Sequence, residues 1–250
     1  LASQGVDIDF IIPYDAKHPG IDYMNIYSAT PLPPNYYDLG AYNNGSPEDR
    51  ENAQDEHGLS PMRAVQRRYG KYVRKFVKSH QPDAIHAHDW LTYPAGLHAK
   101  QVSGKPLCIH VHATDFDRSR GQVNPTVYGI EKDGMDNADC IMCVSELTRQ
   151  TVINQYHQDP RKVFTVHNAV YPLTQEIAEI PRPDHKGKEK LVTFLGRITM
   201  QKGPEYFIEA ANMVLHRTRN VRFCMAGSGD MMNQMIYLAA ERGIADRFHF

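Results

Sequence analysis

The sequence predicts an α/β protein made of two domains, each with a parallel β-sheet. Short apolar runs alternate with longer amphipathic segments along most of the chain, which is the pattern of βαβ units. The alternation fails once, in a stretch rich in proline and charge, and such a composition is typical of a linker. The length of 250 residues suits two modest domains. We therefore expect a first domain over residues 1–170, a linker over 171–189 and a second domain over 190–250.

The first domain opens on a short segment, 1–5, that resembles the last turn of a helix with a glycine C-cap. An irregular excursion rich in Pro, Gly, Asn and Tyr is expected over 14–60. Apolar runs bounded by turn residues predict the strands, and apolar residues at helical spacing predict the helices. The expected strands are 6–12, 84–86, 107–111, 140–144 and 162–166, and the expected helices are 61–79, 93–102, 125–137 and 146–156.

The second domain repeats the same rhythm after the linker. We expect strands over 191–195 and 221–225, helices over 204–217 and 231–242, and the start of a further strand over 247–250. Few strands are present in this part, so the second parallel-sheet domain is expected to be incomplete within this chain.

Composition excludes several classes of protein. The chain has 28 Lys and Arg against 29 Asp and Glu, and a nucleic-acid-binding protein needs a cationic excess, so we expect no nucleic-acid partner. No apolar run reaches the roughly 20 residues of a membrane-spanning helix, and no signal peptide opens the chain. The four cysteines lie in apolar stretches, as reduced thiols do. The expected location is the cytoplasm.

The helix expected over 61–79 carries many cations and no acidic residue. Its basic side chains are Arg63, Arg67, Arg68, Lys71, Arg74, Lys75 and Lys78. A basic amphipathic helix can lie on an anionic membrane. It can equally be the solvated face of an α/β domain, and we favour that interpretation because no apolar anchor faces outward.

Residues able to do chemistry cluster where the expected strands end. In the first domain these segments are His86-Ala-His-Asp-Trp90 and the run from His110 to Arg120, and in the second they are 196–203 and 227–229. Ligand sites of open parallel sheets lie at these carboxyl ends. The segment 196–203 joins a strand to a helix and carries an arginine and a lysine, which is an arrangement that binds anions.

The two His-x-His pairs allow a second hypothesis. Residues two apart on a strand face the same side, so His86, His88, His110 and His112 could bind a metal ion, with Asp89 or Asp115 completing the ligand set. A metal-dependent hydrolase is therefore an alternative. It would leave the basic glycine-containing loop without a role, and we expect no metal site.

Four landmarks in order resemble GT-B glycosyltransferases. They are the His86–Trp90 segment, a histidine at the end of the next strand (His112), Phe194-Leu-Gly-Arg197 followed by Lys202-Gly203, and Ala226-Gly-Ser-Gly229. The chain is most similar to the retaining family 4 and to the glycogen and starch synthases. The resemblance runs from about Asp83 to the end of the chain, with the linker in the matching place.

The resemblance implies two Rossmann-like domains facing a cleft and transfer of a sugar with retention of anomeric configuration. It implies that Arg197 and Lys202 hold the diphosphate of a nucleotide-sugar donor. It also implies that the glycines of the two loops contact this donor, namely Gly196, Gly203, Gly227 and Gly229. His112 would lie beside the transferred sugar and Asp89 would line the acceptor side. No metal or other cofactor is implied, because the two cations would stabilise the charge that develops on the leaving group.

Two family features fall outside the sequence. The glycine-rich loop after the first strand would precede Leu1, and a pair of glutamates spaced E-x7-E would follow Phe250. We therefore expect this chain alone to be inactive, and a non-catalytic nucleotide- or sugar-binding module is the third hypothesis. The donor remains open between UDP-glucose, ADP-glucose and GDP-mannose. The His86–Trp90 segment favours glucose transfer to a glycan, in particular an α-glucan, whereas the basic helix keeps a lipid-linked acceptor open.

Overall fold

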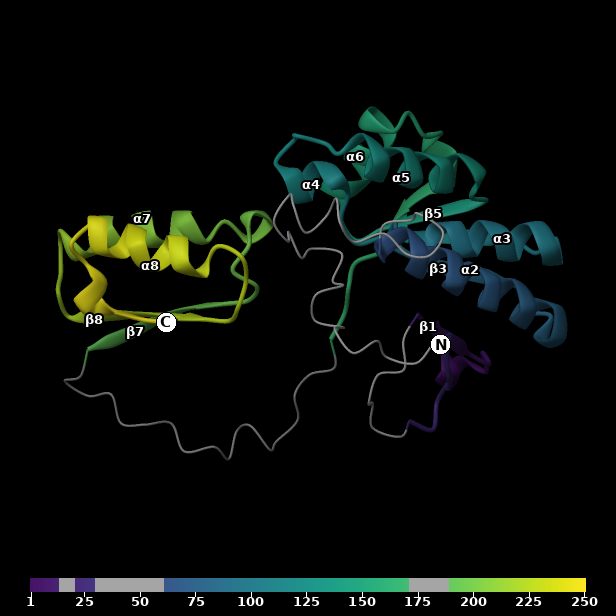
Figure 1. The fold of residues 1–250 in the computed structure, drawn as a ribbon, viewed down its shortest axis with the longest axis horizontal. Helices are drawn as coiled ribbons and strands as arrows, with labels where there is room; N and C mark the ends of the chain where they lie inside the picture. Colours follow the sequence, from purple (N-terminus) through teal and green to yellow (C-terminus); the bar gives the residue numbers. More distant parts are fainter. Residues whose placement is uncertain (14–20, 30–60, 171–188) are drawn as a thin grey trace. The chain divides into compact units, whose positions relative to one another are not determined.

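The computed structural model describes residues 1–13, 21–29, 61–170 and 189–250 (Figure 1). The chain divides into two compact units, one of residues 1–115 and 123–168, the other of residues 116–122 and 169–250. Residues 171–188 of the expected linker 171–189, and most of the irregular excursion, fall outside the described residues. Both units contain parallel β-sheets with helices, which is the α/β class predicted from the sequence.

The first unit is built on a four-stranded parallel sheet in the order β3-β4-β5-β6. Its strands are β3 (Ile85–His88), β4 (Leu107–Val111), β5 (Cys140–Cys143) and β6 (Val163–Thr165). The crossover helices are α3 (Tyr93–Ser103), α5 (Pro125–Asn137) and α6 (Glu146–Gln155). Helix α3 packs on β3 and β4, and α6 packs on β5 and β6. All four strands are parallel, so the loops that follow them leave from the same edge of the sheet.

Side-chain caps explain why the crossover helices begin where they do. Asn124 accepts hydrogen bonds from the N–H groups of Thr126 and Val127, and Pro125 occupies the first helical position of α5. Ser145 caps α6 in the same way through the N–H of Thr148. Both starts agree with the sequence prediction, because the capping signals are local.

Successive side chains of a strand point to opposite faces of the sheet, and this alternation decides which of them enter the core. Ala87, Leu107, Ile109, Ile141 and Val163 are buried on one face of the sheet. In the strand register His88 pairs with His110, so these two residues and their neighbours at even positions lie on the opposite face. The histidines of both His-x-His pairs therefore share one side of the sheet.

A second, two-stranded parallel sheet pairs β1 (Asp9–Ile12) with β2 (Asn25–Ser28). The 20-residue helix α2 (Pro61–His80) contacts it, since the Tyr69 hydroxyl donates to the Ile11 carbonyl at 2.9 Å. Strand β2 lies inside the stretch predicted to be irregular, so that prediction was wrong here. Turn-forming residues flank this four-residue strand, so its sequence gives no clear strand pattern. Its pairing with β1 stabilises it.

The second unit contains the parallel strands β7 (Lys190–Leu195), β8 (Val221–Ala226) and β9 (Phe248–His249), in that order. Helices α7 (Pro204–Leu215) and α8 (Met232–Glu241) follow β7 and β8. Its core comprises Ile198, Ile208, Ala211, Leu215, Val221, Phe223, Met225, Met235, Ala239 and Ile244. The unit thus has an apolar core of its own, formed between the helices and the sheet.

The described residues also form short 3₁₀ turns. Three of them are Ala2–Gln4, Pro160–Lys162 and Ala245–Arg247. Gly5 ends the first turn with a left-handed φ of 77°, as the predicted glycine C-cap requires. A fourth turn, Met200–Lys202, lies in the basic loop of the second unit.

One strand boundary and one helix near the first-unit histidines differ from the sequence prediction. Strand β3 runs to His88 instead of ending at His86, because the buried Ala87 between the histidines continues the alternation. A short helix, α4 (Asp115–Ser119), was not predicted. Its polar sequence has no apolar periodicity, so nothing local indicates a helix.

A buried polar network supports the segment after β4. Glu131 of α5 is 1% exposed, and its Oε2 accepts from the backbone N–H of Asp115 at 3.2 Å and from the Tyr156 hydroxyl. The Asp115 Oδ2 accepts from the Asn124 N–H at 2.6 Å. Burial, followed by the Glu131 charge, raises the pKa of Tyr156 far above its usual value. The phenol therefore stays protonated and can donate to the carboxylate.

Removing the hydroxyl group of Tyr156 should destabilise the first unit. We expect Tyr156→Phe to lower the free energy of unfolding by about 1–3 kcal/mol, because a buried carboxylate loses a donor. Tyr237→Phe is the matched control, since Tyr237 is 74% exposed. Urea unfolding followed by circular dichroism measures both variants. Equal midpoints for Tyr156→Phe and the wild type would show that the network contributes no net stability.

Candidate functional site

The site of the first unit forms where β3 and β4 end. The backbone N–H of His112 donates to the Asp89 Oδ1 at 3.0 Å, and the Asp89 N–H donates to the His110 carbonyl at 3.0 Å. These bonds continue the pairing of the two strands past their last residues. The structure thus brings together the two residues predicted to be catalytic, although they are 23 positions apart in the sequence.

Asp89 occupies a backbone conformation that few residues adopt. Its φ is 57°, in the left-handed region that aspartate tolerates better than most residues other than glycine. The Thr92 hydroxyl donates to the His88 carbonyl at 2.7 Å and to the Asp89 carbonyl at 3.1 Å. The turn is therefore held by a side chain that the sequence analysis did not single out. A threonine three residues after an aspartate is too common a signal to have revealed it.

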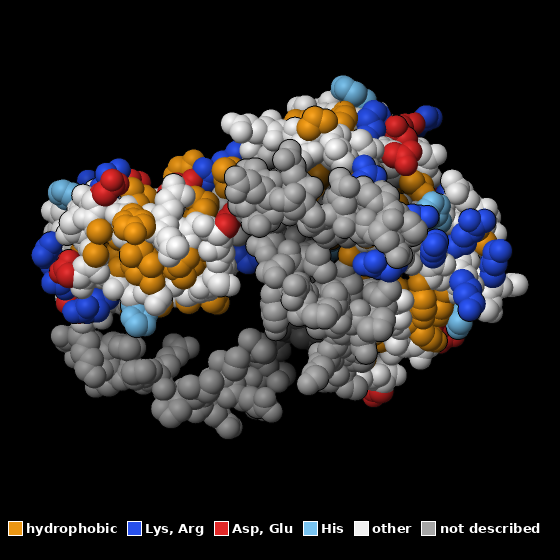
Figure 2. Space-filling view, viewed as in Figure 1, with side chains coloured by type: hydrophobic (Ala, Val, Ile, Leu, Met, Phe, Trp, Pro, Cys, Tyr) orange, Lys and Arg blue, Asp and Glu red, His pale blue; other side chains and the backbone are white. Residues whose placement is uncertain are grey.

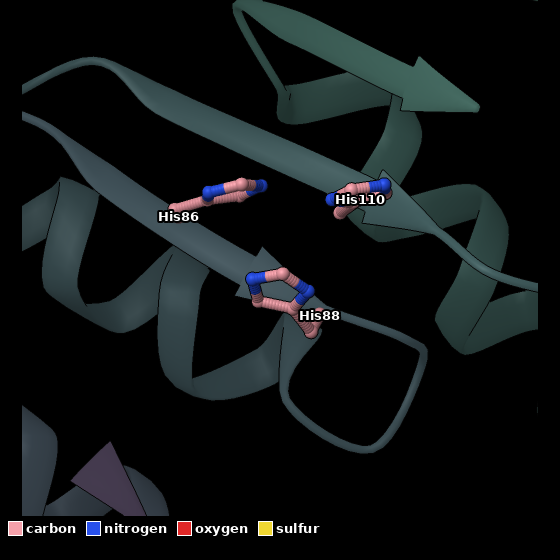
Figure 3. Close-up of side chains that lie close together, drawn as sticks. All are labelled: His86, His88 and His110. Atoms are coloured by element: carbon pink, nitrogen blue, oxygen red, sulfur yellow. The ribbon is translucent and has the colours of Figure 1, made fainter. Parts of the chain in front are cut away.

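The four histidines lie side by side across the two strands. Ring centroids are 4.3 Å apart for His86 and His88, 5.0 Å for His88 and His110, and 4.4 Å for His110 and His112. The Nδ1 of His88 lies 3.0 Å from the Nε2 of His112. Figure 3 shows His86 and His88 projecting from β3 and His110 from β4.

Desolvation and mutual proximity lower the pKa of three of these imidazoles, those of His86, His88 and His110. Burial lowers the pKa of His88 to about 4, helped by the charges of His86 and His112. Burial also lowers the pKa of His110 to about 4, with His112 the next cause. The pKa of His86, whose side chain keeps contact with solvent, is lowered too, first by partial desolvation and then by the charge of His112. Near neutral pH one ring nitrogen of each of these three residues can therefore accept a hydrogen bond or bind a metal ion.

Asp115 does not join this cluster as a ligand. It is 7% exposed, and one of its carboxylate oxygens accepts from the Asn124 backbone. The carboxylate therefore organises the segment that follows β4. Within the described residues, the group able to share an ion consists of His86, His88 and His110, whose ligand atoms all lie within 4.8 Å of one another.

The site of the second unit is the loop between β7 and α7. Arg197 and Lys202 are exposed, and the Arg197 Nη2 donates to the Gln201 Oε1 at 3.2 Å. Within the described part of the chain, no hydrogen bond or ion pair is found for the Lys202 ammonium group. Gly203, with a φ of 62°, serves as N-cap of α7 without a side-chain cap bond. Two cations thus stand beside a helix N-terminus, which is an arrangement that favours anions.

The predicted glycines hold two loops of the second unit together. The N–H of Gly196 donates to the Ala226 carbonyl at 3.1 Å, and the N–H of Ile198 donates to the Ser228 carbonyl at 2.9 Å. A Cβ on Gly227 would lie 1.9 Å from the Gly196 oxygen, and one on Gly229 would lie 2.2 Å from the Ile198 oxygen. Close backbone packing therefore accounts for these two glycines, and their contact with a ligand stays a prediction.

This packing predicts a structural defect in Gly227→Ala. Gly227 has a φ of 150°, so a Cβ adds backbone strain to the clash. We expect the free energy of unfolding to fall by about 1–3 kcal/mol, which is the usual cost of overpacking. Gly243→Ala is the control, because Gly243 also has a positive φ but open space around its Cβ. Thermal unfolding compares the two. A Gly227 variant as stable as the control would contradict the close packing.

Both units are α/β units with parallel strands, and the candidate residues lie where those strands end. The model of the family Glycosyltransferase Family 4 matches residues 1–172 of the chain. The model of the family Glycosyl transferases group 1 matches residues 176–250. The chain belongs to glycosyltransferase family 4 and has the GT-B fold of that family. The family and fold expected from the ordered landmarks are confirmed.

Known relatives agree with this family. An uncharacterized glycosyltransferase of Methanocaldococcus jannaschii is 27% identical over 179 residues, covering 67% of this chain and 46% of the relative. An Escherichia coli enzyme named UDP-Gal:alpha-D-GlcNAc-diphosphoundecaprenol alpha-1,3-galactosyltransferase is 26% identical over 178 residues, covering 65% and 45%. The chain thus spans about half the length of the curated relatives it matches.

Solved structures share the fold at low sequence identity. Sucrose-phosphate synthase of Thermosynechococcus elongatus aligns with a TM-score of 0.65 and 15% identity, covering 98% of this chain and 69% of that one. Anabaena HepE in complex with UDP and glucose aligns with a TM-score of 0.60 and 16% identity, covering 91% and 56%. Identity at this level supports the architecture alone.

Proposed function

We propose that the protein transfers a hexose from a nucleotide-diphosphate sugar to a glycan, with retention of anomeric configuration. The observation that carries this proposal is the loop after β7, where Arg197 and Lys202 stand beside the N-terminus of α7. Family membership supplies the reaction class. In this proposal the loop binds the diphosphate of the donor, and Gly196 and Gly203 form its turns.

The charge distribution of the reaction explains the need for these cations. Breaking the bond between the anomeric carbon and the diphosphate leaves positive charge on the sugar and additional negative charge on the leaving group. Fixed cations beside the diphosphate stabilise that negative charge in the transition state. Lysine supplies a point charge, and arginine can bind two phosphate oxygens at once.

The first-unit site is suited to the sugar and the acceptor. His112 is exposed, and its Nε2 already lies 3.0 Å from the Nδ1 of His88, so its ring position is restrained. Asp89 is tied to the His112 backbone. We propose that His112 contacts the transferred sugar and that Asp89 interacts with the acceptor hydroxyl. Restrained polar groups of this kind stabilise charge with little reorganisation.

Glucose is the proposed hexose, and an α-glucan is the proposed acceptor. One observation supports this choice, the likeness of the His86–Trp90 segment to that of the glycogen synthases. UDP-, ADP- and GDP-linked sugars remain the candidate donors. The proposed location is the cytoplasm, supported by the four free cysteines, which suit a reducing compartment.

An acceptor carried by a lipid is the second candidate. Within the described residues no helix is long and apolar enough to cross a bilayer. The seven cations of α2 are all exposed and form no ion pair with other described residues. In Figure 2 many Lys and Arg side chains gather on the part of the surface where α2 lies. A helix of this charge could bring the protein to an anionic membrane.

A donor screen tests the proposal. The full-length protein is incubated with UDP-glucose, ADP-glucose or GDP-mannose and an α-glucan, a lipid-linked acceptor or water. We expect one donor to be consumed, with release of its nucleoside diphosphate and with an α-linked product by NMR. Consumption with the lipid-linked acceptor alone would replace the α-glucan. No consumption of any of the donors would reject the proposed reaction.

A further inference from the structure

We propose that His86, His88 and His110 form a binding site for a divalent transition-metal ion of the zinc type. This inference departs from the sequence expectation that no metal site is present. It concerns the face of the β3–β4 sheet, and the argument for it does not rest on the proposed sugar transfer. Figure 3 shows the three imidazoles that would bind the ion.

The backbone places the three rings on one side of the sheet. His86 and His88 are two positions apart on β3, and His110 is the register partner of His88 on β4. Two histidines at i and i+2 with a third from the adjacent strand form a three-imidazole face, and zinc commonly binds three histidines with one open position. The two strands therefore supply all three protein ligands of such a site, and they hold them on rigid secondary structure.

Only a small rearrangement would be needed for binding. The candidate ligand atoms lie within 4.8 Å of one another. A tetrahedral ion with Zn–N bonds of about 2.0–2.1 Å needs nitrogens about 3.3 Å apart. Rotation about the last side-chain torsion moves an imidazole nitrogen by this amount, and this torsion is broad in histidine. The backbone of the strands can stay in place.

The unsatisfied nitrogens of His110 point to a missing partner. Both ring nitrogens are buried, and neither has a hydrogen-bond partner among the described residues. A buried polar group without a partner is costly. A metal ion bound to one nitrogen would remove part of that cost. The depressed pKa values of the three residues are consistent with this role, because only the neutral imidazole binds a metal ion.

The bond between His88 and His112 is compatible with an ion. It occupies the Nδ1 of His88, so the Nε2 remains for metal binding. Histidine ligands usually donate their second N–H to a neighbouring acceptor, which orients the ring. His112 offers such an acceptor at 3.0 Å. The ion would thus fix His88 as the donor and the Nε2 of His112 as the acceptor.

Cobalt titration tests the site, because Co²⁺ replaces Zn²⁺ in such ligand sets and absorbs visible light. Tag-free full-length protein is titrated with CoCl₂, and Zn²⁺ is then added as competitor. We expect one equivalent to bind with a tetrahedral d–d spectrum that Zn²⁺ abolishes. His86→Gln and His110→Gln should each weaken binding more than about tenfold, since each removes a ligand. His216→Gln, an exposed histidine of the second unit, should bind as the wild type does.

Three results would overturn the proposal. They are an absence of stoichiometric binding in the wild type, equal affinity in His86→Gln and the wild type, and a thiolate charge-transfer band showing that cysteines bind the ion. If His110→Gln does not fold by near-UV circular dichroism, His86→Gln decides, because His86 is exposed. The titration uses no nucleotide sugar, so its outcome is separate from that of the donor screen.

Discussion

Lys202→Ala should reduce kcat/KM for the nucleotide-sugar donor at least about a hundredfold. Loss of one fixed charge or donor at the developing negative charge costs on the order of 2–4 kcal/mol of transition-state stabilisation. The ammonium group is exposed and has no partner in the described part of the chain, so its removal leaves the fold intact. Initial rates of nucleoside diphosphate release measure the effect.

Lys190→Ala is the matched control for this variant. Lys190 is exposed and begins the same strand, β7, at the end away from the loop. We expect its rates to match those of the wild type. Equal rates in Lys202→Ala and Lys190→Ala would remove Lys202 from the donor site and leave the loop as a structural turn.

His112→Ala should lower kcat by about a hundredfold or more while the fold is retained. The side chain is exposed, and its backbone N–H can still bond Asp89 in the variant. The expected loss is that of a single polar group that stabilises charge on the reacting sugar. Steady-state kinetics at saturating donor separates this effect on kcat from a change in KM.

His98→Ala is the control in the same unit, because His98 is exposed on α3 and lies outside the strand ends. Unfolding curves of both variants should overlap with that of the wild type. A His112→Ala enzyme with at least a third of the wild-type kcat would contradict a role at the transferred sugar.

Elements with local signals could be predicted from the sequence. Helix α5 has the predicted bounds, because Asn124 and Pro125 mark its start. Strand β4 has the predicted bounds, because apolar residues alternate with partly exposed ones between turn residues. The pairing of Asp89 with His112 follows from the rule that parallel strands end at one edge.

Features that depend on tertiary contacts could not be predicted. Strand β2 forms through its pairing with β1. Glu131 looks like an ordinary helix residue in the sequence, yet it is buried because Tyr156 and the Asp115 backbone surround it. Gly227 matches a nucleotide-binding pattern, whereas the structure shows that its missing side chain lets two loops approach. Such roles become visible only when residues distant in sequence are placed together.

In the basic loop between β7 and α7, the sequence motif predicts the backbone elements but not the side-chain contacts. Its strand, turn and helix appear where the sequence predicts them. The bond between Arg197 and Gln201 is a detail of side-chain geometry that spacing does not contain. A bound diphosphate would compete with Gln201 for the guanidinium group.

Nucleoside diphosphate titration tests the central claim most directly. Full-length wild-type protein, Lys202→Ala and Lys190→Ala are titrated with UDP, ADP and GDP by calorimetry. We predict that one of the three nucleotides binds the wild type and Lys190→Ala with equal affinity, and that Lys202→Ala binds it at least about tenfold more weakly. Binding of none of the three to the wild type, or equal binding to Lys202→Ala, would contradict the assignment of the β7–α7 loop to the donor diphosphate.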